Sequence, residues 1–259
     1  MPSRPPLLAL TREVSPSIVR CELTYLAREP IDHRRAVLQH EEYERMLRSL
    51  GCEVERIPAS PDLADAVFVE DTAVVVEELA VITRPGAVSR RRETRPVAAA
   101  LARHRTLVCI DAPGTLDGGD VLRAGHRVYV GESTRSNAEG RAQLRQALAP
   151  FGYSVEAVAM TGCLHLKSAV TAVSDGLLLV NPAWVDPARF AGFECIVVDP
   201  AEPRAANALP VGEALLHGAD YPRTRDRLER HGFRVAPVDL SELAKAEGAV
   251  TCCSVILTL

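Results

Sequence analysis

The chain has 259 residues, of which 47% are hydrophobic and 25% charged, so it is long enough to bury a large apolar core. Its formal net charge of −4 gives no field that would attract nucleic acid or an anionic membrane surface. The seven cysteines include no C-x-x-C pair, which argues against a disulfide framework and a structural zinc site. We therefore expect free thiols, no metal and no cofactor.

No segment reaches the roughly 20 consecutive apolar residues that a membrane-spanning helix needs. Residues 1–10 contain only a brief apolar run without a small-residue cleavage pattern, so we expect no secretory leader. Together these features predict a cytoplasmic protein.

A helix end followed by a short strand recurs along the chain. Its five occurrences read LGCEVERI, RHRTLVCI, FGYSVEAV, AGFECIVV and HGFRVAPV, at intervals of about 40 to 53 residues. Four of them carry glycine in the second place, where a residue of positive φ ends a helix, and all have apolar residues at two matching positions. Recurrence at this period indicates a repeat architecture.

Each short strand is followed by a loop and then by one or two apolar strands, so the unit reads strand, loop, hairpin, helix. The last unit stops at Leu259 without a return strand, and PLLALT near the N-terminus can complete it. We therefore expect an α/β protein with a single domain over residues 1–259, in which five ββαβ units close into a ring. The alternative is a doubly wound sheet, although no G-x-G-x-x-G or P-loop follows any strand.

A closed ring would bring the equivalent loop of every unit to the central axis. In chain order these loops are FVEDT, LDGGD, CLHLKS, RAAN and TCCS. They carry the carboxylates Glu70, Asp71 and Asp117, the imidazole of His165 and the thiol of Cys252. Such a set suits nucleophilic catalysis, and the carboxylates favour a cationic substrate.

Several stretches of the chain, from about Leu8 to the C-terminus, resemble one family. They are FVEDTAVV, ITRPGAVSRR, LDGGDVL, GESTRSNAEG, LHLKS and ELAKAEGAVTCCSV. In this order they are similar to the guanidine-modifying (pentein) superfamily, and most closely to the dimethylarginine dimethylaminohydrolases. The resemblance implies a five-bladed α/β propeller around a central active-site channel. It also implies hydrolysis of asymmetric dimethylarginine and monomethylarginine to citrulline and dimethylamine or methylamine, through a covalent cysteine thiouronium.

The resemblance also implies catalytic roles. Cys252 matches the family's nucleophile, His165 its general acid and base, and Asp117 the carboxylate that orients the imidazole. Cys253 has the opposite strand parity and is expected to point away from the cavity. Asp120 is expected either to join this group or to cap the loop backbone.

Four further residues match family positions that bind the substrate. Glu70 and Asp71 correspond to residues that contact the guanidinium, whose N–H donors pair with carboxylates. Arg84 and Arg135 correspond to arginines that hold the α-carboxylate, which the guanidinium fork binds through two hydrogen bonds.

The amino-acid end of the substrate is expected to meet Asp65 and the backbone carbonyls of Leu23 and Ala246. Two departures from the family pattern occur near this end: Ala246 replaces a valine and Ser136 a threonine. Both departures concern side-chain selectivity and leave the chemistry unchanged.

Lys167 helps to choose between relatives, because arginine deiminases and amidinotransferases place an aspartate two residues after the catalytic histidine. A lysine there fits a substrate whose far nitrogen is methylated. An arginine deiminase or an amidinotransferase of the same superfamily is the alternative. A non-catalytic binding protein with this ring is disfavoured, because the thiol and imidazole are retained. The expected partner is a small molecule, and the chain is expected to be a monomer or homodimer.

Overall fold

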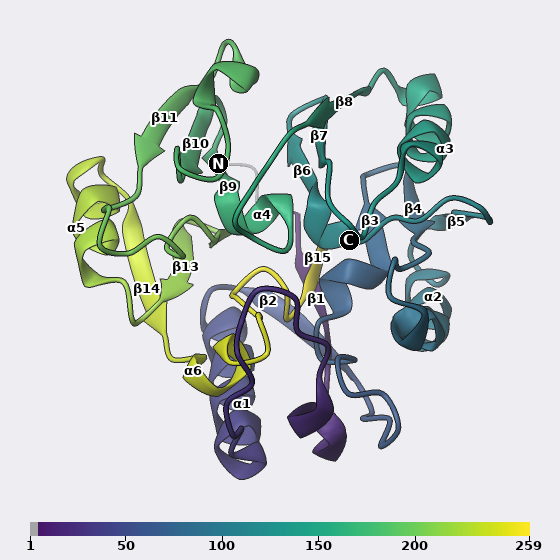
Figure 1. Cartoon of the computed structure of the whole chain (residues 1–259), viewed down its shortest axis with the longest axis horizontal. Helices are drawn as coiled ribbons and strands as arrows, with labels where there is room; N and C mark the ends of the chain where they lie inside the picture. Colours follow the sequence, from purple (N-terminus) through teal and green to yellow (C-terminus); the bar gives the residue numbers. More distant parts are fainter. Residues whose placement is uncertain (1–4) are drawn as a thin grey trace.

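Five three-stranded sheets surround a central axis in the computed structural model, which describes residues 5–259 (Figure 1). The sheets are β3-β4-β5, β6-β7-β8, β9-β10-β11, β12-β13-β14 and β15-β1-β2. In each, the first-named strand is antiparallel to the middle strand, which is parallel to the third. The first-named strands β3, β6, β9, β12 and β15 form the inner edge of the ring. The five-bladed α/β propeller predicted from the sequence is confirmed.

The strands are short, and their bounds follow the repeat. They are β1 (Leu7–Arg12), β2 (Cys52–Ile57), β3 (Ala73–Val75), β4 (Leu79–Ile82), β5 (Thr106–Cys109), β6 (Val121–Ala124), β7 (Arg127–Gly131), β8 (Ser154–Val158), β9 (Val170–Ser174), β10 (Leu177–Val180), β11 (Glu194–Val197), β12 (Ala208–Val211), β13 (Ala214–Gly218), β14 (Arg234–Val238) and β15 (Val255–Thr258).

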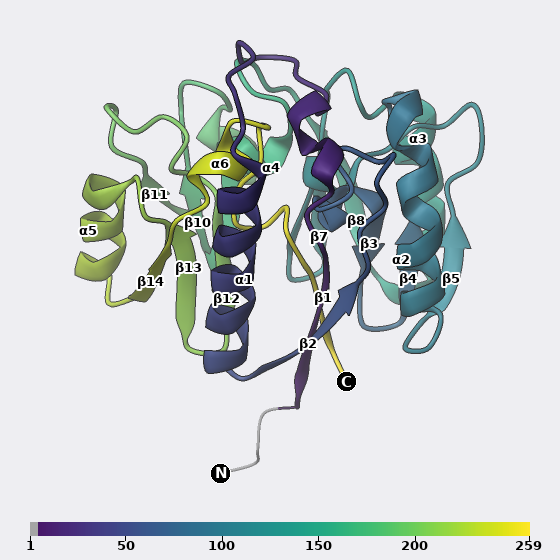
Figure 2. The same ribbon diagram turned by 90° about the horizontal axis from the view of Figure 1, so that it is seen from below.

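Helices connect the middle strand of a sheet to its parallel neighbour, because parallel pairing needs a crossover. The crossover helices are α1 (His33–Ser49), α2 (Thr94–Leu101), α3 (Ala138–Leu148) and α5 (Pro222–Arg230). They lie at the periphery of the ring, and the view turned by 90° shows them standing beside the strands (Figure 2). Shorter helices lie in the loops: α4 (Leu166–Ala169), α6 (Ser241–Ala244), and the 3-10 helices η1 (Pro16–Arg20), η2 (Val69–Thr72), η3 (Val88–Glu93), η4 (Gly118–Asp120), η5 (Ala149–Phe151) and η6 (Pro187–Phe190).

The four glycines of the repeat all have positive φ. The angles are 94° at Gly51, 80° at Gly152, 89° at Gly192 and 87° at Gly232. Glycine reaches this left-handed region without the steric cost of a Cβ atom, so each marks the point where the chain turns from helix to strand. The pattern that predicted the repeat therefore reflects a backbone requirement.

The unit between β10 and β11 departs from the prediction of one helix per unit. Only the 3-10 helix η6 is present there, and no α-helix. Residues 181–193 form this connection and contain Pro182 and Pro187. Proline has no N–H and disfavours a helical conformation in the residue before it, so Pro182 and Pro187 leave little length for a regular α-helix in this connection.

The two ends of the described chain close the ring. β15 pairs with β1 in antiparallel register from Leu10↔Val255 to Leu7↔Thr258, as the sequence predicted. The expectation about a leader in residues 1–10 falls partly on residues 1–4, which lie outside the described residues. Within residues 5–259, no helix is both long and apolar enough to cross a bilayer.

The apolar core is divided among clusters that join neighbouring blades. One cluster, for example, packs Leu8 and Leu10 of β1 against Ala80 of β4 and Val97 and Leu101 of α2. Because the apolar side chains pack between blades and helices, the axis is left for the polar loops that precede the inner strands.

Tyr43 ties the peripheral helix α1 to the turn before β15. Its hydroxyl donates to the Val250 carbonyl at 2.9 Å and lies 2.6 Å from Ser254 Oγ, and the side chain is fully buried. We expect Tyr43→Phe to lower the free energy of unfolding by about 1 to 3 kcal/mol, because it leaves buried partners unsatisfied. Urea denaturation measures this change. Tyr25→Phe, at a half-exposed side chain, is the control; equal losses in both variants would contradict the account.

Candidate active site

The five loops that precede the inner strands meet at one end of the ring, and hydrogen bonds join them. Thr251 Oγ1 donates to Glu70 Oε2 at 2.7 Å, and Lys167 Nζ donates to Glu70 Oε1 at 2.5 Å. Asn207 Nδ2 donates to Thr251 Oγ1 and to the Lys167 carbonyl, both at 3.0 Å. The second loop joins through Gly119, whose N–H donates to Asp71 Oδ1 at 3.0 Å. The convergence predicted from the sequence is therefore present.

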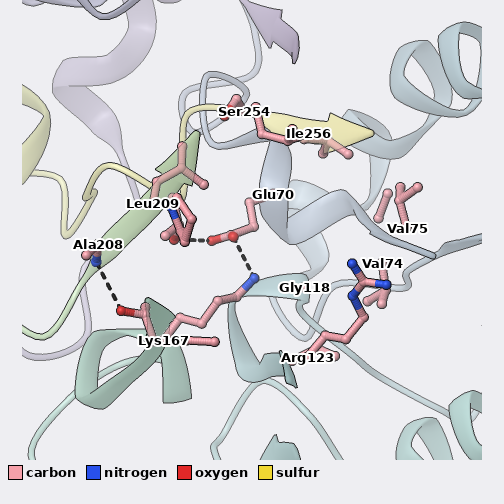
Figure 3. Close-up of a pocket in the computed structure, with 17 residues that line it drawn as sticks. Glu70, Val74, Val75, Gly118, Arg123, Lys167, Ala208, Leu209, Ser254 and Ile256 are labelled. Carbon is pink, nitrogen blue, oxygen red and sulfur yellow. Dashed lines mark hydrogen bonds and ion pairs between the residues drawn. The ribbon is translucent and has the colours of Figure 1, made fainter. Parts of the chain in front are cut away.

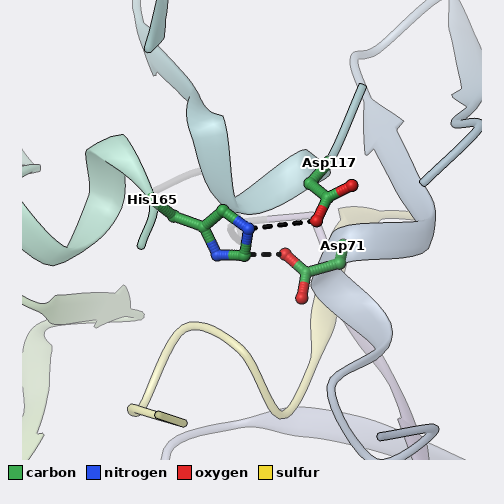
Figure 4. A group of neighbouring side chains, drawn as sticks. All are labelled: Asp71, Asp117 and His165. Carbon is green, nitrogen blue, oxygen red and sulfur yellow. Dashed lines mark hydrogen bonds and ion pairs between the residues drawn. The ribbon is translucent and has the colours of Figure 1, made fainter. Parts of the chain in front are cut away.

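His165 lies between two carboxylates (Figure 4). Its Nε2 is 3.1 Å from Asp117 Oδ2, and its Nδ1 is 3.6 Å from Asp71 Oδ1. All three side chains are buried. Burial alone would lower the pKa of His165, but the Asp71 charge and the Asp117 hydrogen bond raise it to about 9. The imidazole is therefore protonated at neutral pH and can act as an acid.

Asp71 is held as an anion. Burial alone would raise its pKa, but His165 and Arg90 lower the pKa of Asp71 to about 2. Arg90 Nη1 donates to Asp71 Oδ2 at 2.6 Å, and its Nη2 donates to the carbonyls of Asp65 and Phe68. Arg90 thereby fixes both the charge and the backbone of the loop that carries Asp71.

Asp117 and Asp120 also have partners that fix their orientation. Asp117 Oδ1 accepts the Gly86 N–H at 2.9 Å, so the oxygen that faces His165 is held in place. Asp120 accepts the Leu166 N–H at 3.1 Å and the Ser136 hydroxyl at 2.6 Å. These contacts agree with the expectation that Asp120 caps loop backbone.

Below the loops, Glu70 and Lys167 close a cavity of about 230 Å³ between the inner strands (Figure 3). Arg123 of β6 and Ile256 of β15 are among its other lining residues. Burial raises the pKa of Glu70, although Lys167 and Thr251 oppose this. The Glu70–Lys167 pair thus places opposite charges at the wall of this cavity, next in the chain to Asp71 and two residues after His165.

Cys252 lies in the last of the five loops and is half-buried. Its carbonyl accepts the Glu70 N–H at 3.2 Å, which places it beside the acidic loop. Burial, followed by the negative charges of Glu70 and Asp71, raises the pKa of the Cys252 thiol. A cation bound against these carboxylates would remove part of that effect and favour the thiolate.

The neighbouring Cys253 has a different environment. It is fully buried in an apolar cluster with Tyr43 and Leu47 of α1, and its thiol donates to the Ala249 carbonyl at 3.6 Å. Of these two adjacent cysteines, only Cys252 has an exposed part.

Only some of the residues predicted to bind the amino-acid end of the substrate lie close to one another. Leu23 and Arg135 line a common cavity of about 470 Å³, and Arg135 Nη2 donates to Thr24 Oγ1 at 3.1 Å. Asp65 accepts the N–H of the adjoining Glu22, and Ala246 is buried. Arg84 is placed differently, because its Nη1 donates to the Gly114 carbonyl at 3.0 Å.

Three polar residues that contribute to the site, Arg90, Asn207 and Thr251, were not predicted. Arg90 is one of three consecutive arginines, and nothing in that run distinguishes the buried member. Asn207 and Thr251 lie in the predicted loops, but their residue types are common in turns. Lys167 was noted for its place after His165, whereas its ion pair with Glu70 was not predicted.

Among residues 5–259, the geometry would allow Asp71, Asp117 and His165 to share a metal ion, since their ligand atoms lie within 4.8 Å of one another. A protonated imidazole cannot ligate a metal. With its pKa raised to about 9, His165 carries one positive charge between the two carboxylates, and Arg90 supplies a second at Asp71. The arrangement is therefore better suited to proton transfer beside a bound cation.

Comparison with known proteins gives a consistent family. Residues 25–187 match the family model described as N,N dimethylarginine dimethylhydrolase, eukaryotic. The chain is 43% identical over 259 residues to the N(G),N(G)-dimethylarginine dimethylaminohydrolase of Streptomyces coelicolor, covering 99% of this chain and 98% of the relative. Identity to the enzyme of that name from Pseudomonas aeruginosa is 37% over 225 residues, covering 86% of this chain and 89% of the relative.

Solved structures agree with the sequence comparisons. A cysteine-to-serine variant of the Pseudomonas aeruginosa enzyme, complexed with citrulline, matches with a TM-score of 0.93 and 34% identity, over 98% of this chain and all of that one. The N-terminal domain of ArgZ, a cyanobacterial arginine dihydrolase, matches with a TM-score of 0.87 over 98% of each chain. Its identity is 20%, so this second likeness shows the fold alone.

Because the Asp71 charge raises the pKa of His165, we expect Asp71→Asn to lower that pKa by about one unit or more. A histidine NMR titration measures it, with the exposed Asp62→Asn as control. In the parent chain the folded pKa of about 9 exceeds the usual 6.5, so protonated His165 stabilises the fold fully below pH 6.5. This stabilisation is lost as the pH rises through 9. An unchanged His165 pKa in Asp71→Asn would contradict the assignment.

Proposed function

Because the chain belongs to the dimethylarginine dimethylaminohydrolase family, hydrolases that act on amidine carbon–nitrogen bonds, we propose that it converts Nω-methylated arginines to citrulline. The other product is methylamine or dimethylamine. The observation that carries the proposal is the placement of a protonated imidazole between two carboxylates, beside a loop that bears a half-buried thiol.

Charge selects the substrate class in this proposal. Asp71 stays ionised, and its oxygens already accept hydrogen bonds from Gly119 and Arg90. Because each carboxylate oxygen can accept a second hydrogen bond, Asp71 can still receive an N–H donor of a guanidinium. Both oxygens of Glu70 already accept hydrogen bonds, one from Lys167 and one from Thr251. The pocket therefore has few free acceptors. A dimethylated nitrogen has no N–H to satisfy, so it suits this pocket better than the end of free arginine.

In the proposed first half-reaction, cation binding allows the Cys252 thiol to release its proton to solvent. The thiolate attacks the guanidinium carbon and forms a tetrahedral adduct. Protonated His165 donates its proton to the methylated nitrogen, and the carbon–nitrogen bond breaks. The amine leaves, and the substrate carbon stays bound to Cys252 as a thiouronium.

In the second half-reaction, neutral His165 takes a proton from water as the water oxygen attacks the same carbon. The carbon–sulfur bond then breaks, and the proton released as the urea carbonyl forms returns to the Cys252 thiolate. Citrulline leaves with His165 protonated again. Asp117 supports both steps, because its hydrogen bond holds the ring and favours the charged form.

At the amino-acid end, Arg135 is the better-supported partner of the α-carboxylate, because it lies in the same cavity as Leu23. Arg84 does not line that cavity, and its Nη1 donates to the Gly114 carbonyl, so its part remains a prediction. The carbonyls of Leu23 and Ala246, with Asp65, are proposed to receive the α-amino group.

A citrulline assay tests the proposal, with arginine, monomethylarginine and the symmetric and asymmetric dimethylarginines as substrates. We expect asymmetric dimethylarginine and monomethylarginine to react fastest, because one terminal nitrogen then keeps its N–H donors. Free arginine as the best substrate would instead favour a deiminase. Citrulline formed without release of a methylated amine would also reject the reaction.

The cysteine pair provides a matched comparison. Cys252→Ser should lower kcat by about 10³-fold or more, because a serine hydroxyl is a far weaker nucleophile at neutral pH. Cys253→Ser should keep kcat within a few-fold, since that side chain lies in the core. A dead Cys253→Ser enzyme beside an active Cys252→Ser enzyme would reverse the assignment.

A further inference from the structure

Residues 22–26 form a strap that separates two cavities at the mouth of the ring. Leu23 and Thr24 line the cavity of about 470 Å³ that also contains Arg135. Tyr25 and Leu26 line a second cavity, of about 170 Å³, together with Trp184. The strap therefore contacts both the amino-acid end of the proposed site and a neighbouring space.

The strap is held by one carboxylate from the far end of the sequence. Glu247 Oε2 accepts the N–H of Thr24 at 2.9 Å, and its Oε1 accepts those of Tyr25 at 2.6 Å and Leu26 at 2.9 Å. Hydrogen bonds from N–H donors to an ionised carboxylate are stronger than neutral ones. Three consecutive backbone donors are thus satisfied by a single side chain.

The backbone of Glu247 is unusual at the same place. Helix α6 ends with the Gly248 N–H donating to the Leu243 carbonyl and the Glu247 N–H donating to the Ala244 carbonyl. This Schellman arrangement requires a left-handed residue, for which glycine is preferred. Glu247 has φ of +60°, the only positive φ of a non-glycine residue among residues 5–259. Backbone geometry alone would favour glycine at position 247. The presence of glutamate therefore indicates that its side-chain contacts matter.

We infer that Glu247 is a positioning residue for substrate binding, because it sets the strap against the turn that contains Ala246. Ala246 directly precedes Glu247, and Leu23 directly precedes the first N–H that Glu247 accepts. The carboxylate therefore fixes the separation of the two carbonyls proposed to hold the α-amino group. This inference rests on the proposed function.

The other contacts of the strap cannot replace Glu247 once substrate is bound. Arg135 donates to Thr24 Oγ1, but in the proposed complex it turns to the α-carboxylate. Asp65 accepts the Glu22 N–H and is also proposed to face the α-amino group. Ser89 Oγ also donates to the strap, at Glu22 Oε1 (2.5 Å), but only at its first residue. Glu247 therefore holds residues 24–26 without a proposed contact to substrate.

Glu247→Gly removes the carboxylate and at the same time supplies the residue that the backbone prefers. We therefore expect the melting temperature to stay equal or rise, while KM for asymmetric dimethylarginine rises about tenfold or more with kcat within about twofold. Glu247→Gln keeps the length of the side chain but loses its charge, and should give an intermediate KM. Glu156→Gln, at an exposed position of β8, is the matched control for charge.

Trp184 is the only tryptophan of the chain and lines the same cavity as Tyr25 and Leu26, so its fluorescence reports on the strap without any turnover. Acrylamide should quench Trp184 more strongly in Glu247→Gly than in the parent chain, and Glu156→Gln should match the parent.

A Glu247→Gly enzyme with parental KM and parental quenching would overturn the inference. A fall in melting temperature with KM unchanged would also overturn it, because the glutamate would then serve only the turn. If the parent chain hydrolyses no methylated arginine, the proposed function fails, and the quenching comparison then supports or overturns the role of Glu247 on its own.

Discussion

An ionisable side chain that is buried away from water needs a partner of opposite charge, and the centre of this ring buries several at once. Glu70 is paired with Lys167, Asp71 with Arg90, and His165 with Asp71 and Asp117. Asp71 and Arg90 belong to the same blade, β3-β4-β5, whereas the Glu70–Lys167 pair and the two pairs of His165 each fasten one blade to another. Stability at the axis and the electrostatics of the site therefore depend on the same contacts.

This constraint also explains, in the proposed mechanism, why the thiol stays unreactive until a cation binds. The carboxylates that attract a cation are the ones that keep the Cys252 thiol protonated and the His165 imidazole charged. A guanidinium bound among these carboxylates lowers the free energy needed to ionise the Cys252 thiol. His165 is already protonated at that stage, so it can act as the acid. Substrate binding and activation of the nucleophile then become a single electrostatic event, without a separate base for the thiol.

Local patterns were enough to predict the ring and its loops. The glycines that end helices and the apolar positions after them follow from backbone geometry within a few residues, and five repeats fix the closure. The contacts that hold the site are far apart in sequence: Lys167 lies 97 residues from Glu70, and Thr251 lies 181 residues from it. Glu247 and Thr24 are 223 residues apart. The packing of η3 against η2 likewise decides which arginine of residues 90–92 is buried. No periodic pattern in the sequence indicates which one it is.

The attack of Cys252 on the guanidinium carbon is the step on which the proposed chemistry depends, and mass spectrometry of the quenched His165→Gly variant tests it most directly. Without the imidazole that activates water, asymmetric dimethylarginine should leave a thiouronium on the peptide that contains Cys252, heavier by the substrate less dimethylamine. If acid catalysis limits the first step, an activated analogue with a better leaving group should give the adduct. An unmodified Cys252 under both conditions, or an adduct on another cysteine, would contradict the account.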